Sequence, residues 1–160
     1  MEIGIRRAVS ADAEELALVE TKAYWNDSSI SEPQKFRKES YTELLNGGAD
    51  IFALTYDGQI AAVCIVLKCE DEDYSGYAEI SEICVVPEMQ GNGFARKLIL
   101  HSLDEARKNG FKNAYARCLG GADDGFEEQT VRLFKGLGFD VQKSSPDHTG
   151  IYEIIFTRIL

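Results

Sequence analysis

The sequence has little proline, little histidine and a deficit of positive charge. Three prolines and two histidines occur in 160 residues, and 17 Lys and Arg residues against 27 Asp and Glu residues give a net charge of −10. Binding to nucleic acid or to an anionic membrane needs Lys and Arg that contact phosphates. The charge balance therefore argues against both partners. It favours a cationic small molecule or a basic peptide, with an acidic surface that only maintains solubility as the alternative.

Long apolar runs and closely spaced cysteine pairs are also missing. The longest apolar run, Ile60–Leu67, has eight residues, whereas a membrane-spanning helix needs about 20. The N-terminal residues show no basic segment followed by an apolar stretch, so no secretory signal is expected. The four cysteines, at positions 64, 69, 84 and 118, have no CxxC spacing. We therefore expect reduced, buried thiols in a cytosolic protein, rather than a metal site or disulfides.

What the chain does have is a regular alternation of strand and helix patterns. No repeat or linker interrupts the 160 residues, which predicts a single domain over residues 1–160. Ser10 is expected to cap the first helix and Pro33 to begin the second. Strands are predicted at 3–5, 51–56, 60–67, 77–86, 113–118, 139–141 and 151–159, and helices at 10–23, 33–46, 95–109 and 126–137. This order predicts an α/β (α+β) domain with a mixed, mostly antiparallel central sheet flanked by helices.

The most informative segment is the glycine-rich turn between strand 77–86 and helix 95–109. Gly91, Gly93 and Ala95 are small, so backbone N–H groups are accessible at the positive end of the helix, an arrangement that binds phosphate or pyrophosphate. A P-loop would need Gly-Lys-Ser/Thr where Gly93-Phe94-Ala95 stands, and a dinucleotide fold would need a third small residue where Arg96 stands. A turn that merely connects strand and helix is the remaining alternative.

Two motifs resemble the GNAT-type (GCN5-related) N-acetyltransferase family. The segment from Gln90 to Ala95, QGNGFA, matches the family's R/Q-x-x-G-x-G/A signature, and the segment from Thr130 to Phe139, TVRLFKGLGF, is similar to its A-I-x-L-Y-x-x-L-G-F helix and turn. The resemblance implies a single domain that binds acetyl-CoA where two parallel strands, 77–86 and 113–118, splay apart. It implies no metal.

The resemblance also implies which residues bind acetyl-CoA. Backbone groups near the end of the first parallel strand would pair with the pantetheine arm, and the amides of the glycine turn would hold the pyrophosphate. Lys97 would either supply charge nearby or remain a solvated helix residue, and Phe134 would either pack against the pantetheine or belong to the core. The implied cofactor-binding residues are Cys84, Val85, Val86, Gln90, Gly91, Asn92, Gly93, Phe94, Ala95, Arg96 and Phe134.

Acetyl transfer to an amine requires a group that removes a proton, because an alkylammonium with a pKa near about 10.4 is almost fully protonated at pH 7. Strand 77–86 carries two carboxylates, Glu79 and Glu82, and a carboxylate can act as general base directly or through water. We favour Glu82 because it is closer to the glycine turn and to the expected thioester. The alternative for each is a solvated or ion-paired strand residue.

The sequence departs from the family pattern at two positions. Phe134 replaces the tyrosine with which many family members protonate the leaving thiolate, and Glu127 replaces a frequent asparagine. The general acid is therefore left open among Tyr115, Tyr152 and Cys118. These departures keep a second class of function open, a coenzyme A-binding regulatory or partner-binding domain without turnover.

Acceptor recognition is expected from the end of the first helix and from acidic loops. Tyr24 and Trp25 with the neighbouring Asp27 combine aromatic surface and a carboxylate, which suits a cation. The acids at 123, 124, 127 and 128 would attract a basic substrate or simply favour a helix start.

Together with the family resemblance, these residues predict an acetyl-CoA-dependent N-acetyltransferase that acts by direct transfer on a primary amine of a small cationic metabolite or peptide. A protein N-terminal or lysine acetyltransferase is an alternative, and the sequence leaves a homodimer open.

Overall fold

The structure is a computed structural model that describes residues 1–122 and 125–160. Asp123 and Asp124, which we expected to help attract a basic substrate, lie outside the described residues. The chain forms two compact units, the first made of Met1–Leu67 and Glu82–Ser102 and the second of Lys68–Ser81 and Leu103–Leu160. We describe each unit by itself.

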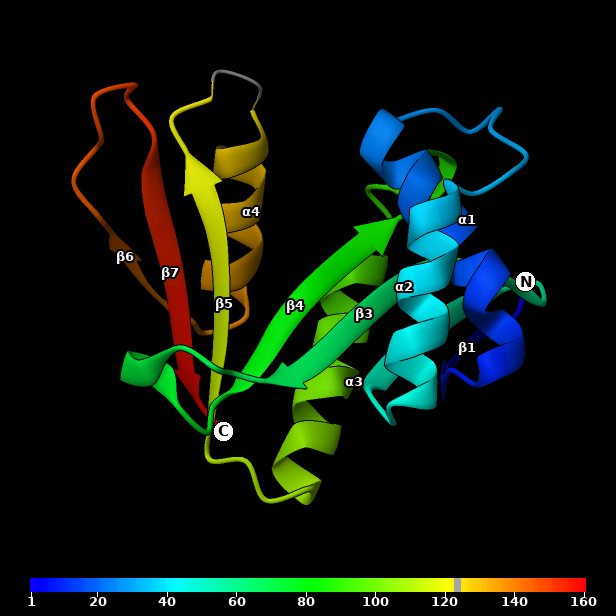
Figure 1. The fold of residues 1–160 in the computed structure, drawn as a ribbon, viewed down its shortest axis with the longest axis horizontal. Helices are drawn as coiled ribbons and strands as arrows, with labels where there is room; N and C mark the ends of the chain where they lie inside the picture. Colours follow the sequence, from blue (N-terminus) through cyan, green and yellow to red (C-terminus); the bar gives the residue numbers. More distant parts are fainter. Residues whose placement is uncertain (123–124) are drawn as a thin grey trace. The chain divides into compact units, whose positions relative to one another are not determined.

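The strands and helices follow the predicted order (Figure 1). The strands are β1 (Ile3–Arg7), β2 (Asp50–Tyr56), β3 (Gln59–Lys68), β4 (Ala78–Val85), β5 (Asn113–Gly120), β6 (Asp140–Lys143) and β7 (Tyr152–Ile159). The α-helices are α1 (Ala13–Trp25), α2 (Lys35–Asn46), α3 (Phe94–Lys108) and α4 (Phe126–Gly136). Three elements, β3, β4 and α3, begin in one unit and end in the other, β3 only by its last residue, Lys68.

Within the described residues, the seven strands form one sheet with the order β1-β2-β3-β4-β5-β7-β6. The pairs β1–β2, β2–β3, β5–β7 and β6–β7 are antiparallel. Strands β4 and β5 are parallel, with Ala78 opposite Ala114 and Glu79 opposite Tyr115. The mixed sheet with flanking helices confirms the predicted α/β fold class, and the parallel pair is the one expected from the sequence.

In the first unit, the β2–β3 hairpin and the helices α1 and α2 surround a common core. Asp57 and Gly58 have φ angles of 47° and 85°, and two successive positive φ values are what the predicted tight hairpin turn requires. Helices α1 and α2 lie side by side (Figure 1). The core contains fully buried side chains from both helices and both strands, including Leu16, Tyr41, Ile51, Leu54 and Val63.

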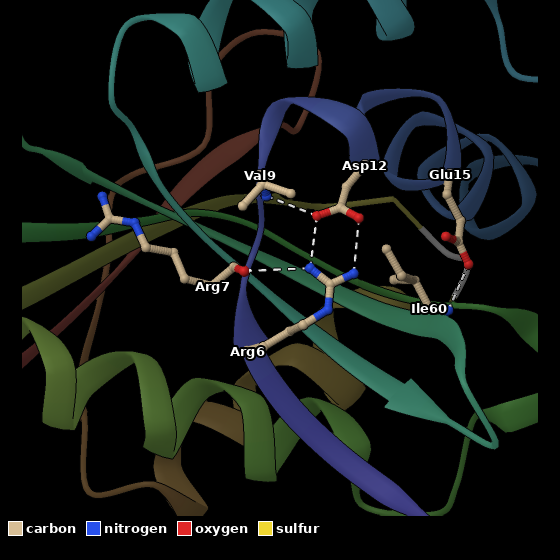
Figure 2. Close-up of polar contacts among 6 residues, drawn as sticks. All are labelled: Arg6, Arg7, Val9, Asp12, Glu15 and Ile60. Atoms are coloured by element: carbon tan, nitrogen blue, oxygen red, sulfur yellow. Dashed lines mark hydrogen bonds and ion pairs between the residues drawn. The ribbon is translucent and has the colours of Figure 1, made fainter.

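The start of α1 differs from the prediction. Ser10 does not cap the helix, because Ser10–Asp12 form a 3₁₀ turn and α1 begins only at Ala13. The carboxylate of Asp12 instead accepts the Val9 N–H at 2.7 Å and two N–H groups of Arg6 at 2.7 and 2.8 Å. Figure 2 shows these three hydrogen bonds. The hydrogen bonds from Arg6 are the main reason that the pKa of Asp12 is lowered. A bidentate ion pair from β1 therefore fixes the helix start.

The second helix also begins later than expected. Its first residue is Lys35, because Pro33 and Gln34 are not helical and Gln34, at φ −64° and ψ 133°, occupies the N-cap position. The backbone N–H of Gln34 donates to the buried hydroxyl of Thr21 on α1 at 3.1 Å. This contact between the two helices, which local patterns do not reveal, sets where α2 starts.

In the second unit, β5, β7 and β6 pack with α4. Strand β5 runs two residues further than predicted, to Gly120, because it stays paired with β7 up to the register position of Tyr152. Glycine is needed there, since a Cβ atom on Gly120 would lie 2.5 Å from the Tyr152 ring. Buried Tyr115, Phe134 and Phe156 form the core of this unit.

Candidate active site

The glycine loop between β4 and α3 has the backbone conformation that the sequence predicts. Gly91 and Gly93 have φ angles of 79° and 75°, a region that favours glycine. Apart from the adjacent residues of the chain, no atom of the described residues lies within 4 Å of the position that a Cβ would take at either glycine. The amides at the start of α3 lie beyond these glycines, and the first N–H groups of a helix have no partner within the helix. The loop can therefore present backbone donors to an anion such as a pyrophosphate.

Two polar side chains hold this loop in shape from within. Gln90 donates its side-chain amide to the carbonyl of Val85 at 3.2 Å, and Asn92 donates to the carbonyl of Met89 at 3.0 Å. Both residues were predicted to contact the cofactor. In the structure their side-chain amides donate to backbone carbonyls of the loop. Their contribution to anion binding is therefore indirect, because they position the backbone N–H groups of the loop.

The other residues predicted for the cofactor differ in what they can offer. The N–H of Val86 donates to Ala61 at 2.9 Å and its carbonyl accepts from Met89 at 3.0 Å, so both backbone groups of Val86 are already hydrogen-bonded. The carbonyl of Val85 accepts from the Gln90 side chain. Phe94 is buried and lies 6.0 Å from the Tyr56 ring, so only its backbone can contribute. Ala95 is half-buried, and Arg96 and Lys97 are exposed.

Of the two candidate general bases, Glu82 has the better-defined environment. Its side chain is half-buried on β4, in the first unit. Burial raises the pKa of Glu82, while the positive charge of Arg37 and a hydrogen bond from the Ile83 backbone oppose that rise. A carboxyl whose pKa is moved toward neutral pH accepts a proton more effectively. Glu79 is also half-buried and lies in the second unit, opposite Tyr115.

The sequence analysis did not single out Arg37. Its guanidinium forms an ion pair with Glu20 of α1, and the two side chains are only 11% and 16% exposed. Its Nε donates to the side-chain oxygen of Gln34 at 2.8 Å, and its guanidinium carbon lies 4.8 Å from the centre of the Tyr24 ring and 5.2 Å from that of Phe36. No local pattern marks this residue, because Glu20 and Tyr24 lie on α1, more than ten residues earlier in the sequence.

The predicted acceptor residues lie in the last turn of α1. Tyr24 and Trp25 are 67% and 58% exposed, and their rings meet edge to face at 5.1 Å. The helix ends at Asn26, which has a left-handed conformation. Asp27 accepts from both the backbone and the hydroxyl of Ser29, which lowers its pKa. The aromatic surface is therefore accessible, while the Asp27 carboxylate also holds the following turn.

A cavity of about 230 Å³ lies in the first unit next to the residues that precede the glycine loop. It is lined by α1, by the β2–β3 turn, and by Val86, Glu88 and Met89. Glu15 accepts the Ile60 N–H at 2.7 Å (Figure 2), and Glu88 accepts the Ser28 hydroxyl at 2.5 Å. The two lining carboxylates, Glu15 and Glu88, are therefore hydrogen-bonded to neighbouring segments of the first unit.

The comparisons with known proteins identify the family. Residues 12–139 match the sequence profile of the Acetyltransferase (GNAT) family, which is most of the chain. The chain belongs to the GNAT family. This family membership confirms the resemblance inferred from the glycine turn and the α4 motif, and it confirms the enzyme class, an N-acetyltransferase.

Named relatives of this GNAT chain include two bacterial proteins. It is 24% identical over 136 residues to the uncharacterised N-acetyltransferase YjgM of Escherichia coli (strain K12), covering 85% of this chain and 74% of that protein. It is 27% identical over 133 residues to an L-methionine sulfoximine/L-methionine sulfone acetyltransferase of Salmonella typhimurium, covering 81% of this chain and 72% of that protein.

The fold is also that of solved family members. The structure of YncA from Salmonella typhimurium, determined with its cofactor acetyl-CoA, matches this chain with a TM-score of 0.73 and 20% identity, covering 99% of this chain and 94% of YncA. This likeness shows the GNAT fold. Among the described residues, no helix is long and apolar enough to span a membrane, and no group of His, Cys, Asp and Glu is arranged to hold a metal.

The second unit shows what replaces the family's usual residues. Phe134 is 3% exposed, stacks on Phe156 at 4.6 Å and meets Phe139 edge to face at 5.0 Å, so it is a core residue of this unit. Glu127 accepts from the Tyr152 hydroxyl and from Lys143, both at 2.7 Å. Where many GNAT proteins have an asparagine, this chain has Glu127, which forms a hydrogen-bonded cluster with Lys143 and Tyr152.

The three alternative proton donors differ in chemistry. Burial raises the pKa of Tyr115 to about 12, and the hydrogen bond to Glu127 raises the pKa of Tyr152. Burial also raises the pKa of Cys118. Each of these shifts makes the group a weaker acid than it ordinarily is.

Proposed function

We propose that this chain transfers the acetyl group of acetyl-CoA directly to the primary amine of a small cationic metabolite or a peptide, with Glu82 as general base. The observation that carries the proposal is the half-buried Glu82 with its raised pKa, on the strand that leads into the glycine loop. A carboxyl in such an environment can take the proton that an ammonium group must lose. Acetyl-CoA as the co-substrate is supported by the YncA structure.

The amides at the start of α3 would hold the pyrophosphate, and Cys84 and Val85 would contact the pantetheine. Open space at the two positive-φ glycines supports this fit, because the backbone can be approached closely there. The net charge of −10 does not oppose it, since backbone amides and the helix terminus supply the positive end that the diphosphate needs.

In the proposed reaction, the free amine attacks the acetyl carbonyl carbon, so that a C–N bond forms and the C–S bond breaks. The proton of the ammonium passes to Glu82, and coenzyme A leaves as its thiolate. A thiol has a pKa near about 8.5, so its thiolate is a good leaving group even without a proton donor. The absence of a hydroxyl at Phe134 is therefore compatible with turnover.

For the acceptor we propose a cation bound at Tyr24 and Trp25. Their exposed rings can bind an ammonium group through cation–π contacts, and the acidic surface would attract it. The Salmonella relative named for methionine sulfoximine and methionine sulfone supports a small amine substrate.

We further propose a cytosolic location, supported by four cysteines that are all free thiols. We propose neither nucleic acid nor a membrane as partner, and a homodimer stays open.

A second candidate is a coenzyme A-binding domain that does not turn over. It is favoured by one observation, that Phe134 lies in the core of its unit where family members carry a tyrosine. Calorimetry with acetyl-CoA tests the premise that both candidates share. Thiol release with polyamines, aminoglycosides, amino acids and peptides then separates them, because only the enzyme releases thiol faster with an acceptor than without.

The role of Glu82 is tested with Glu82→Gln. We expect turnover to fall by about 10²-fold or more near pH 7, the usual size of a general-base contribution, with acetyl-CoA affinity unchanged. The deficit should shrink as the pH rises, because more of the acceptor amine is then already neutral. Glu72→Gln, at an exposed carboxylate in the loop before β4, is the control and should behave as wild type. Equal activity of Glu82→Gln and wild type at pH 7 would remove Glu82 from the mechanism.

A further inference from the structure

The first unit contains a buried tyrosine whose hydroxyl lacks a partner among the described residues. Tyr41 on α2 is 1% exposed, and its hydroxyl oxygen is the one buried side-chain polar atom, in the described part of the chain, without a hydrogen bond. Buried hydroxyls are nearly always hydrogen-bonded, because leaving one unpaired in the interior costs stability. Phenylalanine would fill the same volume without that cost, so the hydroxyl calls for an explanation.

The charged and titratable groups near Tyr41 leave one strong acceptor. Besides burial, the groups that act electrostatically on its phenol are Cys84 and Glu82 on β4, Cys64 on β3, and Arg37 on α2 itself. Burial raises the pKa of Cys64 to about 12 and that of Cys84 as well. Both thiols are therefore neutral at physiological pH. Glu82 is the group in this set that can carry negative charge and accept a strong hydrogen bond.

Arg37 lies one helical turn before Tyr41, so both side chains are on the same side of α2. The charge of Arg37 also favours the ionised form of Glu82, but Arg37 is already paired with Glu20 of α1. A direct Arg–Glu82 ion pair would lower the pKa of Glu82 strongly and make it a poor proton acceptor. A neutral donor such as a tyrosine hydroxyl orients a carboxylate with a smaller effect on its basicity.

We propose that Tyr41 is a positioning residue for Glu82, to whose carboxylate its hydroxyl donates a hydrogen bond through one buried water. The inference rests on the proposed function, in which Glu82 is the general base. The linked hydroxyl fixes the orientation of the carboxylate and partly offsets its burial. A bridging water is the common way in which a buried polar group without a protein partner is satisfied.

The test is the titration of the Glu82 side-chain carboxyl carbon by NMR, in wild type and in Tyr41→Phe, with Glu82→Gln used for assignment. Loss of a hydrogen bond to the charged form should raise the pKa of Glu82 by about one unit, a tenfold change in its protonation equilibrium. The acidic limb of kcat/KM should move to higher pH by the same amount, with KM for acetyl-CoA unchanged. Tyr77→Phe, a half-buried tyrosine of the second unit, is the matched control and should leave the titration unchanged.

An unchanged Glu82 titration in a folded Tyr41→Phe protein, with a higher melting temperature, would overturn the proposal, since the hydroxyl would then be an unsatisfied group and nothing more. Should Tyr41→Phe unfold, Arg37→Lys and Arg37→Gln offer a second test. The lysine variant should keep the wild-type titration within a few tenths of a unit, and only the glutamine variant should raise the Glu82 pKa. A glutamine variant that titrates as wild type would contradict the arrangement around Glu82.

These outcomes can be separated from those of the proposed function. The NMR titration needs no acceptor and no turnover. A shifted Glu82 titration together with full activity of Glu82→Gln would leave the link to Tyr41 standing and reject Glu82 as base. An unchanged Glu82 titration in Tyr41→Phe together with an inactive Glu82→Gln would reject the link to Tyr41 and leave Glu82 standing as the general base.

Discussion

At the scale of single residues, Glu127 shows how a substitution in a family motif is built into the structure. Its carboxylate accepts from Lys143, from the Tyr152 hydroxyl and from the Gly121 backbone. These donors come from β6, from β7 and from the residue that follows β5. Hydrogen bonds to the charged form, first from Lys143 and then from Tyr152, hold the pKa of Glu127 at about 2.

The low pKa of Glu127 predicts a specific pH dependence. A carboxyl with a lowered folded-state pKa stabilises the fold fully above its ordinary value of 4.5, and that stabilisation is lost as the pH falls toward about 2. Glu127→Gln should therefore be less stable than wild type in urea at pH 7, with a difference that shrinks below pH 4.5. Glu128→Gln, one residue along and exposed, is the control. A Glu127 carboxyl that titrates near 4.5 by NMR would contradict the arrangement.

At the same scale, the sequence identified several site residues but not their partners. Glu82 was found because it lies on the strand before a recognisable turn. Its neighbours Arg37 and Tyr41 were missed, because helix periodicity alone treats one as a surface charge and the other as core. The reason is physical: Arg37 pairs with Glu20, and both Arg37 and Tyr41 interact electrostatically with Glu82. Glu20 and Glu82 lie far from them in the sequence.

At the scale of elements, the glycine loop is the segment whose conformation matters most for the proposed cofactor site. Gly93 has a φ of 75° with open space around its missing Cβ, so a methyl group there meets no clash and acts only through backbone strain. A non-glycine residue in this region costs about 1 to 2 kcal/mol. A loop that relaxes to relieve that strain turns its amides away from the anion.

We therefore expect Gly93→Ala to weaken acetyl-CoA binding by about tenfold, the equivalent of about 1.4 kcal/mol, as measured by calorimetry. Gly76→Ala is a matched control, because Gly76 has a φ of 84° and equally open space in the loop before β4. Gly76→Ala should lower the free energy of unfolding in urea by a similar amount and should bind acetyl-CoA with wild-type affinity. Equal loss of affinity in both variants would mean that the effect is not specific to the glycine loop.

Element positions were predicted well where local signals are strong and less well where tertiary contacts decide. The Asp57-Gly58 turn and helix α3 were found because turn residues and a long apolar stripe mark them. The predicted start of α1 at Ser10 is wrong, because the helix begins at Ala13. The ion pair between Asp12 and Arg6 of β1 decides this start. The end of β5 was placed too early, because pairing with Tyr152 continues the strand to Gly120.

At the scale of the whole molecule, the net charge of −10 bears on the acceptor. An acidic protein concentrates cations near its surface and repels anions, and salt screens this effect over a Debye length of about 10 Å at 0.1 M. We expect kcat/KM for a cationic acceptor to fall several-fold between about 0.01 and about 0.5 M salt, a range over which screening becomes strong. An uncharged amine analogue, measured in parallel, should show little change. The same salt dependence for both would exclude steering by charge.

The sequence by itself determined the fold class, the family and the glycine loop, because strand and helix periods, turn residues and short motifs are local properties. It also indicated Glu82 and Glu79 as carboxylates on the strand before that loop. Only the tertiary structure decided that Phe134 is core, that Arg37 pairs with Glu20, and that the buried Tyr41 hydroxyl has no partner among the described residues. Burial and ion pairing depend on residues brought together from distant parts of the chain, and no local pattern encodes which of them meet.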